Sequence, residues 1–236
     1  MMSKEMILKL FLGLACWFTL SPATSLADMT LDKSVIHFEP GKPKRQDVMV
    51  KNNQNTPLYI KVTPYTILNP GTDKQSREKI TNPKKSGLLV SPSKLVVPPN
   101  GKKLIRLLNL DPKRHQHGVY RVAVEPVAGK LVGEESGLKI LIGYELLVLA
   151  QTENPQPKLV AKRNGRSLKL SNEGDTDVYL MEGKQCPSKN ANTKDCAVLR
   201  SGRLYPGNKW TVSLPHDQPA EYKISVGTEH SLRSIP

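Results

Sequence analysis

Short apolar runs separated by clusters of proline, glycine and asparagine constrain the fold of this chain more than any other feature. The runs are rich in Val, Ile, Leu, Tyr and Thr, the residues that favour β strands. Between them stand turn sequences such as Asn69–Thr72 and Pro98–Gly101, in which proline fixes φ and glycine accepts a positive φ. No helical periodicity longer than a turn or two interrupts this rhythm. The pattern therefore predicts an all-β protein.

The strand rhythm predicts two immunoglobulin-like β-sandwich domains. The first spans residues 28–151, and residues 152–157 form a polar linker with two prolines before a second, smaller domain at 158–236. Strands of the first domain are predicted at Thr30–Phe38, Asp47–Asn52, Leu58–Thr63, Leu88–Val90, Leu95–Val97, Lys103–Leu110, Val119–Val127 and Leu138–Ala150. Strands of the second are predicted at Lys158–Lys162, Ser167–Leu170, Val178–Met181, Ala197–Leu199, Trp210–Leu214 and Glu221–Val226.

Residues 1–27 are typical of a secretory signal peptide. Lys4 and Lys9 precede or flank an apolar run, Leu10–Leu20, and a small-x-small site ends at Ala27. A retained membrane anchor would need about 18 or more apolar residues, and this run is shorter. Cys16 lies inside the run, where it does not suit lipoprotein processing. We therefore predict an exported chain that is cleaved after Ala27 and has no membrane anchor.

Export changes the meaning of the charge and of the cysteines. The chain has 35 Lys and Arg against 21 Asp and Glu, a formal net charge of +14 that could suit an anionic partner. Export removes nucleic acid from the list of such partners. Cys186 and Cys196 remain after cleavage, and an even number of cysteines in an exported chain predicts one disulfide. Closing this loop would stabilise the fold by about 3 kcal/mol.

The sequence carries no motif of an enzyme or of a cofactor site. There is no Gly-x-Ser-x-Gly elbow, phosphate-binding glycine loop or zinc-type spacing of cysteine and histidine. Ser76–Lys79 and Ser91–Lys94 match Ser-x-x-Lys without its companion motifs, so we interpret both as chance matches. His115 and His117 have basic residues and a glycine beside them, which indicates a solvated basic turn rather than a metal site. We predict no catalysis, no cofactor and no metal.

The segment Leu138–Ala150 is apolar over thirteen residues, more than twice the usual length of a strand. Its first face at period two contains only apolar and aromatic side chains: Leu138, Ile140, Ile142, Tyr144, Leu146 and Val148. Its second face includes Lys139, Gly143 and Glu145. A long apolar strand at a sheet edge is an aggregation hazard unless another chain pairs with it. The alternative is a central strand buried on both faces.

Several short motifs occur in an order that resembles a known family. They are Ile67–Thr72, Gly87–Pro92, Val97–Gly101 followed by Ile105–Leu107, Tyr120–Val122 with Glu125, the long strand, and the cysteine pair followed by Leu204–Gly207. None is specific alone. In this order the mature chain resembles the periplasmic pilus chaperones of the PapD-like superfamily, two immunoglobulin-like domains set at an angle. The resemblance is greatest to the branch that serves colonisation-factor-type fimbriae.

The resemblance implies a mechanism. Such chaperones lend their long strand to a pilin subunit whose own immunoglobulin fold lacks one, until an outer-membrane usher exchanges it for a neighbouring subunit's extension. By similarity, the inserted side chains are Leu138, Ile140 and Ile142, with Tyr144 as a fourth. The implied partners are pilin subunits and the usher, the implied location is the periplasm, and no nucleotide is needed. Self-capping by a homodimer is one way to protect the free strand.

In the best-known members an arginine and a lysine in the inter-domain cleft hold the terminal carboxylate of the pilin. Here Val35 and Leu147 align with those positions, which is a departure from the family pattern. Arg106 and Arg121 are the candidate replacements, because a buried carboxylate needs charged donors; each could instead pair with a neighbouring acid. Glu125 matches the position from which the family makes an inter-domain ion pair.

A second function keeps the sandwich fold but makes it an adhesin or a carbohydrate-binding module. Sugar-binding platforms usually need exposed aromatic side chains. Trp210 is the one tryptophan left after removal of the signal peptide, so this alternative has less support.

Overall fold

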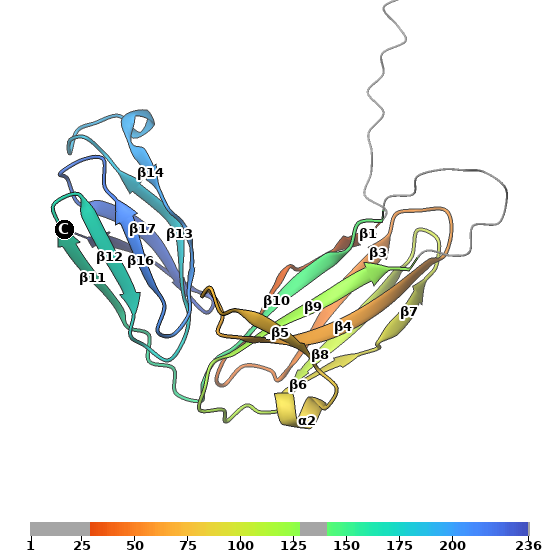
Figure 1. The fold of residues 1–236 in the computed structure, drawn as a ribbon. Helices are drawn as coiled ribbons and strands as arrows, with labels where there is room; N and C mark the ends of the chain where they lie inside the picture. Colours follow the sequence, from red (N-terminus) through yellow and green to blue (C-terminus); the bar gives the residue numbers. More distant parts are fainter. Residues whose placement is uncertain (1–28, 128–140, 236) are drawn as a thin grey trace, which may run out of the picture.

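The chain forms two β sandwiches that are set at an angle and meet at an elbow (Figure 1). The structure is a computed structural model, and it describes residues 29–127 and 141–235. The predicted all-β architecture of two angled immunoglobulin-like domains is confirmed. The predicted signal peptide lies outside the described residues, as do Leu138 and Ile140 of the predicted donor strand.

Two sheets face each other in the first sandwich. One has the strand order β1-β3-β8-β6, and the other has the order β2-β10-β9-β4-β5, with β7 also paired to β4. The elements are β1 (Met29–Leu31), β2 (Val35–Phe38), β3 (Arg45–Asn52), β4 (Leu58–Leu68), β5 (Ser76–Lys79), α2 (Pro83–Ser86), β6 (Leu88–Ser91), β7 (Lys94–Val97), β8 (Lys102–Asn109), β9 (Gly118–Pro126) and β10 (Tyr144–Ala150).

The first core is built by side chains that alternate along these strands. Val48 and Val50 point inward from β3, and Val122 and Val124 point inward from β9, all of them fully buried. This is the period-two pattern that a half-buried strand requires. Residues between them point out of the sandwich. The outer face of the sheet that contains β9 and β10 therefore presents a second set of side chains, and the other domain lies against part of that face.

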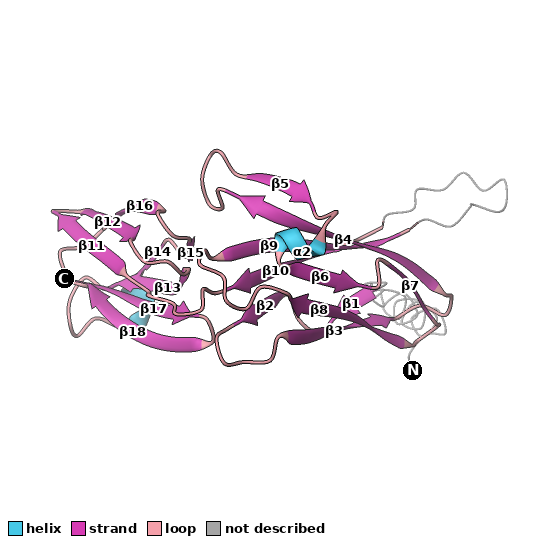
Figure 2. Cartoon of the chain, turned by 90° about the horizontal axis from the view of Figure 1, so that it is seen from below, coloured by secondary structure: helices cyan, strands magenta, loops and turns pink. Residues whose placement is uncertain are grey.

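The second sandwich is smaller. Its sheets have the orders β11-β12-β16 and β14-β13-β17-β18, with β15 paired to β13, and Cys186 is bonded to Cys196 as predicted. The elements are β11 (Leu159–Asn164), β12 (Ser167–Asn172), β13 (Val178–Gln185), η2 (Thr193–Asp195), β14 (Ala197–Leu199), β15 (Gly202–Leu204), β16 (Lys209–Ser213), β17 (Ala220–Val226) and β18 (Glu229–Ile235). Figure 2 shows that strands make up nearly all of both domains.

Tyr222 is the largest side chain in the second core, and Gly183 makes room for it. A Cβ atom at Gly183 would lie 2.3 Å from the Tyr222 ring, closer than carbon atoms approach. The register between β13 and β17 pairs these two residues directly. Glycine is thus required here by the close approach of an aromatic ring to the backbone of the neighbouring strand.

Some elements differ from those that the sequence pattern predicts. β5 and β18 have exposed polar side chains over most of their length, so no apolar alternation marks them. β4 continues through Pro64 to Leu68, beyond the predicted end at Thr63. The long predicted strand is shorter in its described part, because β10 begins at Tyr144 and Leu141–Gly143 are not strand. Within the described ranges, no helix has the length and apolar character that crossing a membrane requires.

Two buried tyrosines should respond oppositely to loss of the hydroxyl group. Burial raises the pKa of Tyr222 to about 12, and its hydroxyl has no hydrogen-bond partner among the described residues. Tyr222→Phe should therefore keep or raise the free energy of unfolding, by up to about 1 kcal/mol. The Tyr120 hydroxyl donates to Ser86 O at 2.6 Å and accepts from Arg114 Nη1 at 2.8 Å. Tyr120→Phe should cost about 1–3 kcal/mol.

Urea unfolding of the two variants, followed by circular dichroism, provides the comparison. A loss of stability in Tyr222→Phe as large as in Tyr120→Phe would contradict the assignment of Tyr222 as an unpaired hydroxyl.

Candidate functional site in the cleft between the domains

The second domain lies on the outer face of the sheet that contains β10. Tyr205, which follows β15, forms an apolar cluster with Ile67 of β4, Val119 of β9, and Leu147 and Leu149 of β10. All five side chains are buried. Their burial fixes one wall and the floor of the cleft that opens between the domains in Figure 1.

Hydrogen bonds hold the domains together on both sides of this cluster. The turn between β4 and β5 reaches the second domain, where Asn208 Nδ2 donates to Pro70 O at 3.2 Å. Gly71 in that turn has φ +73°, and a Cβ atom there would lie 2.4 Å from Asn208 Oδ1, so both its conformation and its contact require glycine. On the other side, the Thr228 backbone N–H donates to Glu39 Oε1 at 2.7 Å.

A buried polar cluster lies at the centre of the junction. Asp177 of the second domain is fully buried and pairs with Arg203 from β15 of the same domain. His117 of the first domain places its Nε2 atom 3.1 Å from Asp177 Oδ1, with its side chain 2% exposed. Burial alone would raise the pKa of Asp177, but the contacts from His117 and Arg203 lower it below its usual value. The carboxylate is therefore charged and joins the two domains.

This cluster corrects two predictions. The solvated basic turn predicted for His115 and His117 holds only for His115, because His117 lies in the domain junction. Glu125 was predicted to make the inter-domain ion pair, but it is exposed near the end of β9 that is remote from the second domain, opposite Lys61. Strand β9 starts at the junction with Gly118, and Glu125 lies several residues further along it. Asp177 and His117 make the contact instead.

Arg121 points from β9 into the cleft and is part of a charged group beside Tyr205. Its Nε lies 3.9 Å from Glu145 Oε2, and Arg77 Nη1 lies 3.2 Å from Glu145 Oε1. Arg77 also lies over the Tyr65 ring, with 4.8 Å between the guanidinium carbon and the ring centroid. Two guanidinium groups thus share one carboxylate, which leaves net positive charge in the cleft. The sequence did not mark Arg77, because β5 has no strand pattern.

Arg106 is not in this cleft. It lies on β8, in the other sheet of the first domain, where the strand register places Asp47 directly opposite. Arg106 Nε lies 3.1 Å from Asp47 Oδ1. The hydrogen bonds from Arg45, opposed by desolvation and aided by Arg106, lower the pKa of Asp47 to about 2. The prediction that strand β8 lies beside the long strand is wrong, and Arg106 has an acidic partner on its own sheet.

The positions that align with the family's two bases are neighbours in the structure. Val35 of β2 and Leu147 of β10 are partners in the parallel register of these strands. Val35 is exposed and Leu147 belongs to the apolar cluster under Tyr205. The place of two bases is thus taken by an apolar pair, and Arg121 is the residue opposite Leu147 on the next strand.

Strand β10 has an unpaired backbone edge. β2 pairs only with Leu147–Ala150, and among the described strands only β9 is paired with Tyr144, Glu145 and Leu146. Ile142, just before β10, is 60% exposed. Tyr144, predicted as a fourth inserted side chain, instead packs on the core of its own domain and donates its hydroxyl to Met29 O at 2.8 Å. It therefore closes the core rather than extending beyond it.

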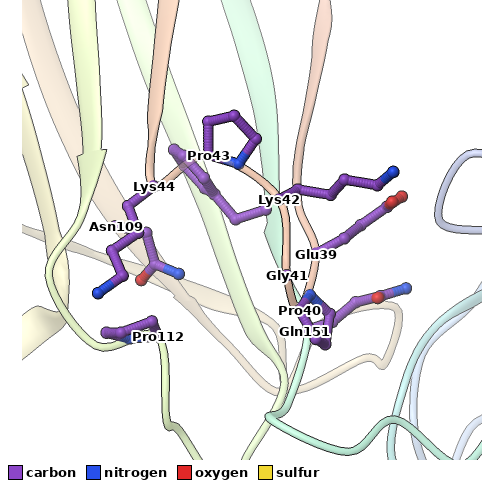
Figure 3. A pocket seen from close by; sticks show the side chains of 10 residues that line it. Glu39, Pro40, Gly41, Lys42, Pro43, Lys44, Asn109, Pro112 and Gln151 are labelled. Carbon is purple, nitrogen blue, oxygen red and sulfur yellow. The ribbon is translucent and has the colours of Figure 1, made fainter.

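A smaller hollow lies behind the elbow and is formed mainly by the loop from Glu39 to Lys44, together with Asn109, Pro112 and Gln151 (Figure 3). Its charged side chains, Glu39, Lys42 and Lys44, come from this one loop, and both lysines are exposed. A Cβ atom at Gly227 of the second domain would meet Glu39 and Gln151. We assign this hollow to the hinge between the domains rather than to a ligand.

Comparisons with known proteins agree with this architecture. No family model matches the chain. The chain is 29% identical to a CS1 fimbrial protein of Escherichia coli over 165 residues, which are 66% of this chain and 68% of that protein. The crystal structure of the class 5 fimbriae chaperone CfaA has a TM-score of 0.63 at 22% identity, over 88% of this chain and 99% of that one.

The SafB chaperone of Salmonella enterica, solved in complex with the SafA pilin, has a TM-score of 0.61 at 14% identity, over 90% of this chain and 97% of that one. The chain thus has the fold of the usher-pathway fimbrial chaperones, and the resemblance to the colonisation-factor-type branch is confirmed.

Removing the charge of Asp177 should destabilise the protein strongly. Asp177→Asn keeps the shape of the side chain but leaves Arg203 buried without a carboxylate, a change that typically costs about 3–5 kcal/mol. The matched control is Glu173→Gln, because Glu173 pairs with Lys158 at 3.0 Å on the surface. The control should cost about 1 kcal/mol or less. Guanidinium unfolding measures both variants, and equal effects would show that the Asp177 contact is not a critical one.

Proposed function

We propose that the chain is a periplasmic chaperone that captures pilin subunits by lending them the segment that leads into β10. The observation that carries this proposal is the unpaired edge of β10 at Tyr144–Leu146, preceded by the exposed side chain of Ile142. An unpaired edge next to exposed apolar side chains is a template for a strand from another chain. The fold supports the proposal, because CfaA and SafB are chaperones of fimbrial systems.

In this proposal, Leu138, Ile140 and Ile142 fill the groove of a pilin that lacks one strand. Burying an aliphatic side chain is worth about 1.5–3 kcal/mol, so three of them give roughly 5–9 kcal/mol. This is enough for capture and still allows exchange when the usher offers the extension of another pilin. No nucleotide is required, because the incoming extension supplies the free energy.

Location and partners follow from the same proposal. Export by the signal peptide at residues 1–27 would place the chain in the periplasm, where pilin subunits and the outer-membrane usher meet it. Before a pilin is bound, pairing of two copies through β10 would cover the unpaired edge.

The alternative, an adhesin or a carbohydrate-binding module, has little support in the described residues. Trp210 packs against the core of the second domain, and Arg200 lies over its ring at 4.2 Å. A ring with one face covered by a guanidinium group is a poor platform for a sugar.

The donor segment is tested by placing charges in it. Replacing Ile140 and Ile142 together with Asp should abolish co-purification of the tagged chaperone with a pilin from its own operon, because the carboxylates cannot enter an apolar groove. The matched control is Val198→Asp, since Val198 of β14 is 88% exposed and lies in the second domain. Circular dichroism checks that both variants are folded. Capture that survives the double substitution would contradict the proposal.

We further propose that Arg121, assisted by Arg77, holds the terminal carboxylate of the pilin in the cleft. Hydrogen bonds to charged groups are worth about 1.5–3 kcal/mol, so Arg121→Ala should weaken binding roughly tenfold to a hundredfold. Arg77→Ala should act in the same direction. Arg106→Ala is the control, because Arg106 lies in the other sheet and pairs with Asp47.

Binding is measured by titrating a fluorescent pilin whose own missing strand is left open. A pilin with its terminal carboxylate amidated should lose the same affinity for the wild-type chain and none for Arg121→Ala. Equal losses for Arg106→Ala and Arg121→Ala would remove Arg121 as the anchor.

A further inference from the structure

His37 is a half-buried imidazole at the domain junction that the proposed function does not use. It lies on the outer face of β2, where the strand register places it beside Leu149 of β10. Its Nδ1 atom is buried and has no hydrogen-bond partner among the described residues. An imidazole in this setting is neutral, because a proton would bring a charge to a site that cannot solvate it.

The charged groups around His37 come from both domains. Asp177 and Glu39 attract a proton to it, whereas Arg203 and a charged His117 repel one. Asp177 is already paired with Arg203, and Glu39 already accepts the hydrogen bonds of Thr228. Burial has the largest effect, and the pKa of His37 is therefore lowered below its ordinary value of 6.5.

We propose that the domain junction is a pH-sensitive latch, in which protonation of His37 weakens the closed packing of the second domain on the first. When the junction opens, water reaches His37 and the imidazole takes a proton near its ordinary pKa of 6.5. The closed form binds that proton less readily. The closed form is therefore fully favoured above pH 6.5 and loses stability relative to the open form as the pH falls from there toward the lowered pKa.

The other groups of the junction do not produce this response. The pKa of Asp177 is lowered from 3.8, so its titration falls well below this pH range. A proton on His117 would lie beside the Asp177 carboxylate, 3.1 Å away, and would favour the closed junction. The direction of the pH response therefore distinguishes His37 from His117. The inference concerns the junction itself and holds whether or not the chain carries pilin subunits.

The Thr228 backbone amide reports on the latch, because it donates across the junction to Glu39 Oε1. Its hydrogen-exchange protection factor in the mature chain, measured by NMR, should fall between pH 7.5 and pH 5.5 by up to about tenfold, the limit for one histidine that is protonated only when open. Amides bonded within one domain, such as Asn109 to Lys44 O and Leu214 to Arg166 O, should keep their protection. Protection of Thr228 that is constant or rises on acidification would overturn the proposal.

The variant His37→Phe keeps an aromatic ring of similar size and cannot bind a proton. Its Thr228 protection should not depend on pH in this range, and His37→Gln is the second variant should the phenylalanine not fold. His115→Gln is the matched control, because His115 is exposed and lies close to the junction in sequence. This control should keep the wild-type response. A pH response that persists in both His37 variants would assign it to Glu39 or another group, and the latch would be wrong.

Discussion

The fixed register of β10 between β9 and β2 is the constraint on which the rest of the molecule depends. One face of the strand places Leu146 and Val148 in the core of the first domain, and the other places Leu147 and Leu149 under Tyr205 of the second. Because side chains alternate, a shift by one residue would exchange the two sets and disrupt both the core and the junction. The same register brings the exposed Ile142 to the end of the strand.

The sequence predicted those features that depend on neighbouring residues. Alternation of apolar side chains reports burial locally, which is why the all-β architecture, the disulfide and the apolar strand up to Ala150 could be predicted. Strands β5 and β18 escaped prediction, since their exposed side chains carry no alternation. Arg77 was missed for the same reason, although its place on β5 brings it to the cleft beside Arg121.

Contacts between distant residues could not be predicted from the pattern. His117 follows a run of basic residues, which indicates solvent, yet the fold places it against Asp177 of the other domain. Arg106 and Arg121 look equivalent in sequence, and only the sheet order separates them. A buried ion pair such as that of Asp177 and Arg203 contributes little net stability once desolvation is counted. Its value here lies in orientation, because a buried carboxylate tolerates few arrangements of its partners.

The junction and the cleft are linked through β10 over a very short distance. His37 lies beside Leu149 in the register, and two residues earlier Leu147 lies between Val35 and Arg121. Tyr205 covers both leucines, and burial raises the pKa of its hydroxyl while Arg203 and Arg121 lower it. A displacement of Tyr205 would therefore change the surroundings of Arg121 directly. Any loosening of the junction is thus felt where the proposed carboxylate anchor lies, without a change in either core.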